Sequence, residues 1–434
     1  MRITIVGTGY VGLVAAVCLA KQGHQVTAVD REPVIRGLRA GVLGIWEPGL
    51  EELFADGRAS GNLRWETDVV RASLDAEALM LAVGTPTRPD GHTDLSQLHE
   101  VLAKFMHHGD CPPLIIVKST VPVGTCDELE VSLRETGLRT EIVSNPEFLR
   151  QGSAIQDFMY PDRIVVGCQS PYAEAELRHL YARIDAPVQV CDRRSAELIK
   201  YAANTFLATK ISFANMMSDL CEGYGADIRQ VMAGVGSDRR IGPHFLQAGV
   251  GYGGSCFSKD LQSLLTSGKL VGLSLPMLEA TAHINEQRIP RFIAKLISCW
   301  GNLQGKRLAV LGISFKPNTN DVRDAPFLTL LKQCQLHGIA VQAYDPVVQH
   351  VPYDGVHVAD SAYTASVGAD AIMILTEWPQ FVSLDWARMA QGMRQPIMLD
   401  GRNLLPNKAV ERFLEHDAAV YIPVGRSVVS CWGD

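Results

Sequence analysis

The chain has 434 residues, more than one compact core holds, so we expect two or three domains. Apolar residues make up 47% of it and charged residues 20%, which is typical of a globular protein. The formal net charge of -7 gives no electrostatic reason to expect nucleic acid or a membrane surface as a partner, although it leaves room for local basic sites that hold a small anion.

Ten cysteines are scattered along the chain without CxxC pairs or a neighbouring histidine cluster. This spacing argues against a structural zinc site, and in a chain of this length it does not indicate a disulfide framework. We expect most of the cysteines to be buried, reduced thiols of a cytoplasmic protein. No run of eighteen uncharged apolar residues is present, so the sequence predicts no membrane span.

The N-terminal segment "MRITIVGTGYVGLVAAVCLAKQGH" is apolar enough to imitate a signal peptide. Glycines interrupt its apolar run, and a coherent strand and turn follow it. We therefore interpret it as the first strand, turn and helix of the fold, and we expect no targeting segment.

The first third of the chain alternates short β-rich runs with helical stretches, which is typical of a parallel sheet covered on both faces. The expected strands lie within residues 2–6, 25–30, 78–86, 114–122, 141–148 and 163–167. This pattern predicts a doubly wound α/β domain that extends to about residue 190.

Gly7, Gly9 and Gly12 form a GxGxxG motif between the first strand and the first helix. The first glycine makes the tight turn, the second lets backbone N–H groups approach a pyrophosphate, and the third packs the helix on the strand. The helix N-terminus then faces the phosphates with its partial positive charge. In this context the motif predicts a dinucleotide site.

Asp30 closes the second expected strand, where an acidic group can accept hydrogen bonds from both ribose hydroxyls. A carboxylate there repels a 2′-phosphate, so it favours NAD over NADP as the cofactor. Arg31 and Arg36 follow it and could soften that preference.

Residues 195–223 contain no proline and no glycine until their end, which predicts one helix of roughly 40 Å. Its apolar residues lie on almost every face, so the helix must be buried on most sides, between domains or in a subunit interface. The interface of a homo-oligomer is the more economical interpretation.

The βα alternation begins again at about Lys306, with strands expected in 307–315, 339–346, 370–378 and 396–403 and a helix in 325–338. This second Rossmann-like domain lacks GxGxxG after its first strand, so it must hold any ligand differently. We therefore expect three regions: an NAD-binding Rossmann domain over 1–193, a central helical and dimerisation domain over 194–300, and a C-terminal Rossmann-like domain over 301–434.

Two polar segments, "AVGTP" at 82–86 and "VKSTVPVGT" at 117–125, lie at strand ends, where open α/β sheets bind ligands. Thr120 is the strongest candidate in them, because a hydroxyl beside the cofactor crevice can orient a water. Ordinary polar turn chemistry at a strand end is the alternative.

Glu147 stands on a turn after a strand and could serve there as a general base, or it could be an acid that interacts with a helix dipole. Lys200 and Asn204 share one face of the long helix at i and i+4. A buried ammonium is costly unless it is paired or functional, so Lys200 is a candidate for stabilising a developing alkoxide. A lysine whose head group reaches solvent is the alternative.

Cys256 lies in the glycine-rich segment "GVGYGGSCFSKDL" at 249–261. The glycines permit close approach of a ligand, Lys259 can favour a thiolate, and Asp260 supplies a carboxylate, which together indicate a nucleophile. The alternative is a small hydrophobic residue in a tight turn.

These segments together resemble the UDP-glucose/GDP-mannose dehydrogenase family over nearly the whole chain. The resemblance rests on nine segments in the family's order: "GTGYVGL", "EPGLEEL", "VGTP", "KSTVPVGT", "NPEFL", "ELIKYAANTFLA", "GYGGSCFSKD", "ISFKPNTNDVRDAP" and "DGRN". It implies NAD-dependent oxidation of the C6 alcohol of a nucleotide sugar to a carboxylate. "LTEWPQF" and "GYGGSCF" favour the UDP-glucose branch, with UDP-glucuronate as product, over GDP-mannose or a UDP-N-acetyl-hexosamine.

The resemblance also implies roles for the candidate catalytic residues. Cys256 is the nucleophile that forms a thiohemiacetal and then a thioester, with no metal required. Lys200 and Asn204 stabilise the alkoxide, and Asp260 works with Lys200 on proton transfer through a water. Thr120 positions that water.

Glu147 would promote hydrolysis of the thioester. The residues that the resemblance assigns to the cofactor are Gly7, Gly9, Tyr10, Val11, Gly12, Asp30, Thr85, Thr120 and Arg323. Those that it assigns to the nucleotide sugar are Glu147, Phe148, Leu149, Lys200, Asn204, Arg240, Phe245, Tyr252, Gly253, Lys316 and Arg402. Family members contribute the arginine that matches Arg240 across a dimer interface, so a homodimer is the smallest assembly that we expect.

Two positions depart from the family's pattern. Gln151 stands where a second glutamate is common, and a neutral amide cannot act as a carboxylate base. Ser258 stands where proline is frequent, which should loosen the loop with little effect on chemistry.

Two other functions compete with this hypothesis. A 3-hydroxyacid-type dehydrogenase also pairs a Rossmann domain with a helix that carries Lys and Asn at i and i+4, but it needs neither Cys256 nor a third domain. A catalytically silent nucleotide-sugar-binding protein would keep the fold without turnover.

Overall fold

A computed structural model describes residues 1–430 of the chain, so Cys431 lies outside the described residues. The chain divides into two compact units. The first comprises residues 1–203 and 262–274, and the second comprises residues 204–261 and those from 275 onward. Each unit is built around one large β-sheet.

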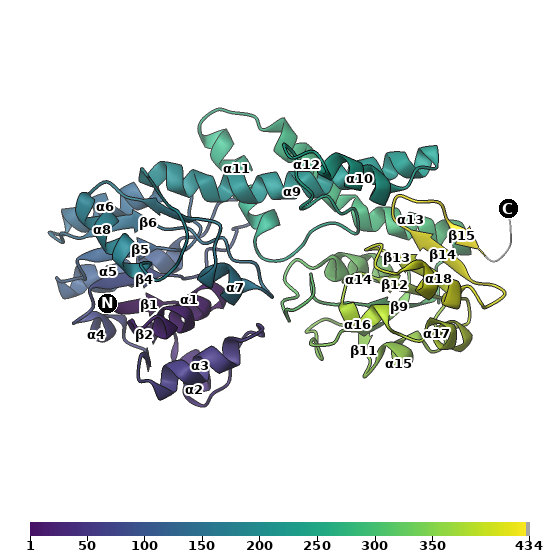
Figure 1. Ribbon diagram of the computed structural model, residues 1–434, viewed down its shortest axis with the longest axis horizontal. Helices are drawn as coiled ribbons and strands as arrows, with labels where there is room; N and C mark the ends of the chain where they lie inside the picture. Colours follow the sequence, from purple (N-terminus) through teal and green to yellow (C-terminus); the bar gives the residue numbers. More distant parts are fainter. Residues whose placement is uncertain (431–434) are drawn as a thin grey trace. The chain divides into compact units, whose positions relative to one another are not determined.

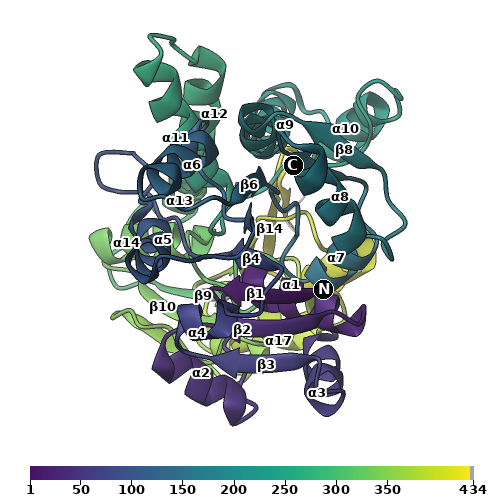
Figure 2. The same ribbon diagram turned by 90° about the vertical axis from the view of Figure 1, so that its left-hand side faces the viewer.

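The first unit contains an eight-stranded sheet in the order β3-β2-β1-β4-β5-β6-β7-β8. Figure 2 shows β4, β1, β2 and β3 stacked in this order. The strands are β1 (Arg2–Val6), β2 (Gln25–Val29), β3 (Leu63–Glu66), β4 (Ala78–Leu81), β5 (Leu114–Val117), β6 (Glu141–Ser144), β7 (Ile164–Gly167) and β8 (Val188–Cys191). The predicted doubly wound α/β domain is confirmed.

One strand pair differs from the parallel sheet that the sequence predicts. Strand β7 runs antiparallel to β6, with Ser144 opposite Gly167. Because β7 starts at the edge where β6 ends, the connecting segment 145–163 begins and ends at the carboxyl edge of β6. That edge is where a doubly wound sheet binds its ligands.

Helices cover both faces of this first sheet. They are α1 (Tyr10–Lys21), α2 (Glu32–Arg39), α3 (Leu50–Ala59), α4 (Val69–Ser73), α5 (Ser96–His108), α6 (Thr125–Glu135), α7 (Ala154–Met159) and α8 (Pro171–Leu180). One core joins α1, α2, α3, α7 and α8 to the sheet, and a second joins α4, α5 and α6 to the other face.

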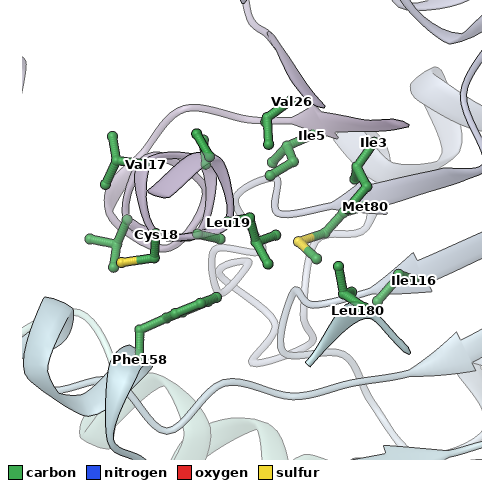
Figure 3. Close-up of a cluster of buried hydrophobic side chains, with 14 of the residues drawn as sticks. Ile3, Ile5, Val17, Cys18, Leu19, Val26, Met80, Ile116, Phe158 and Leu180 are labelled. Atoms are coloured by element: carbon green, nitrogen blue, oxygen red, sulfur yellow. The ribbon is translucent and has the colours of Figure 1, made fainter. Parts of the chain in front are cut away.

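The core around α1 explains why the N-terminal segment is so apolar. Val17, Cys18 and Leu19 of α1 lie with Ile5 of β1 and Phe158 of α7 in this cluster (Figure 3). All of α1 from residue 12 to residue 20 is buried. The apolar run is therefore the central helix of a fold, as the sequence analysis predicts.

The second unit contains a seven-stranded sheet in the order β11-β10-β9-β12-β13-β14-β15, parallel except for the pair β14 and β15. The strands are β9 (Arg307–Leu311), β10 (Ala340–Tyr344), β11 (Val356–Val358), β12 (Ala371–Ile374), β13 (Ile397–Asp400), β14 (Val420–Pro423) and β15 (Val429–Ser430). Its helices are α10 (Ile228–Gly236), α12 (Pro276–Glu286), α13 (Arg288–Trp300), α14 (Pro326–Leu336), α15 (Ala362–Ser366), α16 (Pro379–Val382), α17 (Trp386–Gly392) and α18 (Asn407–Phe413). The predicted second Rossmann-like domain is confirmed.

Two helices contribute residues to both units, α9 (Arg193–Tyr224) and α11 (Phe257–Leu270). Helix α9 has 32 residues and is one unbroken helix in Figure 1. It begins two residues before the predicted start because Asp192 accepts hydrogen bonds from the backbone N–H and the hydroxyl of Ser195.

The structure also bears on two expectations drawn from composition. In the part of the chain that the structure describes, no helix has the length and apolar character needed to cross a lipid bilayer. The nine cysteines among residues 1–430 are all free of disulfides, but only Cys18, Cys126, Cys221 and Cys334 are buried, so the expectation that most are buried is wrong.

Candidate functional site

In the first unit, the GxGxxG turn has the shape that a dinucleotide needs. A Cβ on Gly7, whose φ is +92°, would lie 2.6 Å from the Ala82 carbonyl oxygen, and a Cβ on Gly12 would lie 1.8 Å from the Gly7 oxygen. A Cβ on Gly9 would meet no atom within 4 Å. Packing therefore requires the outer two glycines, whereas the middle one faces open space at the N-terminus of α1, where a pyrophosphate can approach.

The Asp30 carboxylate is fixed at the carboxyl end of β2. One oxygen accepts hydrogen bonds from the backbone N–H (2.7 Å) and the hydroxyl (2.9 Å) of Thr8, and the other accepts from the Arg31 N–H (2.7 Å). The Arg31 side chain is 90% exposed, and Arg36 pairs with Glu32. The residues of this site therefore fit NAD, with a rigid negative charge where NADP would carry a phosphate.

Replacing Asp30 with alanine is expected to weaken NAD relative to NADP at least tenfold. A hydrogen bond to a charged group contributes about 1.5–3 kcal/mol, and the repulsion of a 2′-phosphate disappears with the carboxylate. The ratio of kcat/KM for the two cofactors measures this change. Glu32→Ala is the control, because it removes a nearby carboxylate that pairs only with Arg36 among the ion pairs described; an unchanged ratio in Asp30→Ala would contradict the assignment.

Two candidate cofactor residues stabilise the protein's own loops. The Thr85 hydroxyl donates to the Thr120 carbonyl at 2.8 Å and so ties the end of β4 to the end of β5. The Tyr10 hydroxyl accepts a hydrogen bond from the Gly152 N–H at 2.8 Å. The glycine-rich turn is therefore connected directly to the segment that follows Glu147.

Glu147 and Lys200 form a buried ion pair in the first unit. The Lys200 Nζ donates to the Glu147 Oε1 at 2.9 Å, and their side chains are 4% and 7% exposed, respectively. Burial acts to raise the pKa of Glu147, but the Lys200 ammonium, the Leu149 N–H and the charge of Lys118 outweigh it and hold this pKa below its ordinary value of 4.5. Glu147 is therefore an ionised carboxylate, and not an acid that caps a helix.

Phe148 contacts two cations. The Arg163 guanidinium stacks on its ring, 3.9 Å from the centroid, and the Lys200 Nζ lies 5.5 Å from it. Such contacts orient the ring and add to the attraction that holds Lys200. The predicted segment Glu147–Leu149 is thus in contact with Lys200 through two of its three residues.

The first turns of α9 are anchored to α6, which fixes the position of Lys200. The Arg193 guanidinium pairs with Glu130 at 2.8 Å and with Asp127 at 3.2 Å. Glu197 accepts hydrogen bonds from the Gly124 and Cys126 N–H groups at the N-terminus of α6. A carboxylate at this end of a helix is favourable, because it satisfies N–H groups that have no partner within the helix.

In the second unit, Asn204 and Asp260 form a buried pair. The Asn204 Nδ2 donates to the Asp260 Oδ2 at 2.6 Å, and the Lys259 Nζ donates to the Oδ1 at 2.6 Å. Asp260 is 1% exposed, so its charge needs both partners. Lys259, which the sequence suggests as a partner of the thiolate, therefore pairs with Asp260.

Cys256 stands immediately before α11, and its carbonyl accepts a hydrogen bond from the Asp260 N–H at 2.8 Å. The Ser255 hydroxyl lies 3.8 Å from its sulfur, and the Arg323 guanidinium interacts with it electrostatically. A cysteine at a helix N-terminus close to a cation has the surroundings that favour a thiolate.

The glycines before Cys256 are packed against the chain's own atoms. A Cβ would lie 2.7 Å from the Gly401 oxygen at Gly249, 2.2 Å from the Asp324 oxygen at Gly253, and 2.7 Å from the Phe315 ring at Gly254. The interpretation that these glycines make room for a ligand is therefore corrected: at these three positions the neighbour is protein.

Gly253→Ala is expected to lower the free energy of unfolding by about 1–3 kcal/mol, because the added methyl group overpacks a rigid contact. The displaced loop carries Cys256, so kcat should fall as well. Gly234→Ala is the matched control, since this helical glycine of α10 has no atom within 4 Å of its Cβ position and alanine favours helix. Chemical denaturation of both variants checks this, and equal stability would contradict it.

Among the residues of the second unit that are predicted to bind the nucleotide sugar, some contact aromatic rings of the chain and one is exposed. Tyr252 and Phe245 pack against Phe257 of α11, with ring centroids 5.8 and 6.3 Å away, and the Lys316 Nζ lies over the Phe315 ring. Arg240 differs from these, because its side chain is 88% exposed and pairs with Asp238 of its own turn.

The Arg402 side chain is bonded to other residues of the chain. Its guanidinium donates to the carbonyls of Leu375 (2.7 Å) and Gly251 (3.2 Å) and pairs with Glu377 at 3.1 Å. It therefore connects the ends of β12 and β13 to the segment before Cys256, and its role in binding the nucleotide sugar stays a prediction.

Several residues that support the site escaped the sequence analysis. Glu47 accepts hydrogen bonds from the Gly152 and Ala154 N–H groups, and Asn285 is bonded to the backbone of Tyr252 in both directions. Arg288 donates to the Gly249 carbonyl and pairs with Asp219. "EPGLEEL" was the only sequence signal for Glu47; Asn285 and Arg288 lie on helices with no motif.

Three domain models of one known protein family match this chain. The NAD binding domain of the UDP-glucose/GDP-mannose dehydrogenase family matches residues 1–185, its central domain residues 194–287, and its UDP binding domain residues 309–407. The chain belongs to the UDP-glucose/GDP-mannose dehydrogenase family. Its cofactor is NAD, as the glycine turn and Asp30 predict.

Curated members of the family cover almost the whole chain. UDP-glucose 6-dehydrogenase of Rhizobium meliloti (strain 1021) is 42% identical over 93% of this chain and 95% of its own length. UDP-glucose 6-dehydrogenase YwqF of Bacillus subtilis (strain 168) is 40% identical over 99% and 98%.

Solved structures show the same fold. A UDP-glucose dehydrogenase from Pyrobaculum islandicum superposes with a TM-score of 0.90 at 37% identity, covering 98% of both chains. A UDP-D-ManNAc dehydrogenase from Pyrococcus horikoshii gives 0.87 at 27% identity, covering 98% of this chain and 99% of the other. Members that act on different sugars therefore share this architecture.

Proposed function

We propose that this dehydrogenase oxidises the C6 alcohol of UDP-glucose to the carboxylate of UDP-glucuronate in two steps, with Cys256 as a covalent nucleophile. The observation that carries the proposal is the place of Cys256 at the start of α11, in one unit with the buried pair of Asn204 and Asp260. Curated relatives at about 40% identity that are named UDP-glucose 6-dehydrogenases support the choice of sugar.

The residues of the glycine turn and Asp30 would hold NAD, which when bound supplies the hydride acceptor for both oxidations. The Lys200 ammonium donates a hydrogen bond to the C6 oxygen and stabilises the alkoxide as the alcohol proton leaves. Asp260 assists this proton transfer through a water that Thr120 positions. Asn204 stabilises the same oxygen.

The aldehyde has no second hydride to lose readily until a nucleophile adds to it. The Cys256 thiolate forms a bond to C6, and Lys200 stabilises the resulting thiohemiacetal oxygen. Loss of the second hydride leaves a thioester on Cys256.

Water then attacks the thioester, with Glu147 as the group that accepts its proton, and the Cys256 thiolate leaves. The balance is one alcohol, one water and two NAD⁺ consumed, and one carboxylate, two NADH and three protons formed. Gln151 contributes no base to this step, because an amide does not take up a proton.

A panel of nucleotide sugars tests the proposal. The protein is incubated with NAD and UDP-glucose, GDP-mannose or a UDP-N-acetyl-hexosamine, and NADH is counted per sugar consumed. We expect two NADH per UDP-glucose and a uronate product. One NADH with an aldehyde product would contradict the covalent mechanism, and preference for another sugar would overturn the specificity.

We also propose a homodimer or a higher homo-oligomer. In the second unit, α9 exposes large apolar side chains, among them Phe206 (65% exposed), Leu220 (51%) and Tyr224 (86%). A second copy that covers this face would account for them. Sedimentation analysis measures the assembly. The three-region division and the cytoplasmic location stay predictions.

A further inference from the structure

Lys118 is a buried cation for which the reaction described above has no use. It directly follows β5, and its side chain lies within the first unit, where the whole residue is 5% exposed. Its Nζ donates to the Asn145 carbonyl (3.3 Å), the Asn145 Oδ1 (3.1 Å) and the Tyr181 hydroxyl (3.4 Å). All three acceptors are neutral, which is an expensive environment for an ammonium.

The charged groups that act on Lys118 are those of the proposed active site. Glu147 attracts it and Lys200 repels it, so two buried ammonium groups share one carboxylate. Tyr181, which follows α8, contributes a titratable hydroxyl whose pKa burial raises, and Arg163 stacks on Phe148. Within the described residues, no carboxylate forms an ion pair with Lys118.

Asn145, to which Lys118 donates, stands two residues before Glu147 in the chain. Its N–H donates to the Val117 carbonyl, its Nδ2 donates to the Val165 carbonyl at 2.7 Å, and its Oδ1 also accepts from the Tyr181 hydroxyl at 2.6 Å. Every polar group of Asn145 is thus held between β5, β7 and Tyr181. The turn that carries Glu147 starts from this fixed point.

We propose that Lys118 is a positioning residue, whose ammonium holds the turn Asn145–Glu147, and with it the Glu147 carboxylate, in place for hydrolysis of the thioester. This inference rests on the proposed function of Glu147.

The charge of Lys118 changes with pH close to neutrality. Burial lowers the pKa of Lys118 to about 8, with Glu147 opposing the change and Lys200 adding to it. The ammonium is therefore present below about pH 8 and lost above it. The charged hydrogen bonds that it donates to Asn145 must weaken over the same range.

The ratio of wild-type kcat to variant kcat, measured from pH 6 to pH 10, tests this inference. Lys118→Met removes the charge and keeps the length of the side chain, and Lys118→Gln serves as a second uncharged variant if the first does not fold. We expect a ratio of roughly 10 to 100 at pH 6.5, because a misplaced catalytic group costs this much. The ratio should fall toward 1 above about pH 8, where wild-type Lys118 is itself neutral. Intrinsic pH effects cancel in the ratio.

Tyr181→Phe is the matched control, because it removes a hydrogen-bonding partner of Lys118 and Asn145 and leaves the charge. It should give a ratio that stays constant through pH 8, because Lys118 is present and titrates in both proteins. A constant ratio for the Lys118 variants would show a merely structural role and overturn the inference. The wild type separates this from the proposed function: one NADH per sugar would refute that function whatever the ratio, and two NADH with a constant ratio would refute only the role of Lys118.

Discussion

Cys256→Ser is expected to lower the rate of uronate formation by at least about 10³-fold. A hydroxyl at this position is a much weaker nucleophile than a thiolate at neutral pH, so the aldehyde carbon has no attacking group. The first oxidation does not need the sulfur. The variant should therefore bind UDP-glucose as the wild type does and release at most one NADH per sugar, which rapid mixing and product analysis would measure.

Cys299→Ser is the matched control, because this cysteine is exposed and lies on α13, outside the proposed site. It should keep full activity and a count of two NADH. Uronate formation by Cys256→Ser at a rate close to that of the wild type would exclude the thioester and leave water as the direct nucleophile.

The architecture was predictable because periodicity and glycine spacing report local geometry. Each buried parallel strand is a short apolar run, and the 32 residues of α9 contain no proline. The reversed direction of β7 was not predictable, because an apolar run of four residues looks the same in either direction. Short edge strands such as β3 and β15 also escaped, since too few of their residues are buried to leave a pattern.

The candidate site was predictable only in part. The chain places Lys200 against Glu147 and Asn204 against Asp260, and the motifs named all four residues without their partners. Lys118 stands in a segment that the sequence analysis singled out. A sequence does not show, however, whether the ammonium of a lysine that follows a buried strand is exposed to water or buried. Burial by Asn145 and Tyr181 depends on contacts between distant segments, which a single sequence does not display.

The glycines of residues 249–254 show the same limit. Their number indicates that a side chain is not tolerated, and the sequence does not say what would be in the way. Asp324, Phe315 and Gly401, which occupy that space, come from more than 60 residues further along the chain. A run of glycines looks the same in the sequence whether a ligand or other protein atoms occupy the space beside it.

The second large effect concerns the ion pair of the first unit. Lys200→Met is expected to lower the free energy of unfolding by about 3–5 kcal/mol at pH 7, because it leaves the Glu147 carboxylate buried without its main partner. Activity should be lost as well, since the alkoxide and the thiohemiacetal oxygen lose their stabilising charge. The double variant Lys200→Met with Glu147→Gln should recover stability and not activity, which would separate the two losses.

The stability deficit of Lys200→Met should change with pH in a definite direction. In the wild type the pKa of Glu147 lies below its ordinary value of 4.5, so the stability that the pair contributes is present above that pH and is lost as pH falls through the folded-state pKa. In Lys200→Met the pKa of Glu147 should rise because burial acts unopposed by Lys200, so the deficit relative to the wild type should shrink as pH falls and the carboxyl takes up a proton. Lys210→Met, on the same helix with its Nζ bonded to the Ile241 carbonyl, is the control and should show no such trend. Denaturation curves at several pH values measure all three proteins, and a deficit that stays constant from pH 7 to pH 5 would mean that Glu147 is not the group left unpaired.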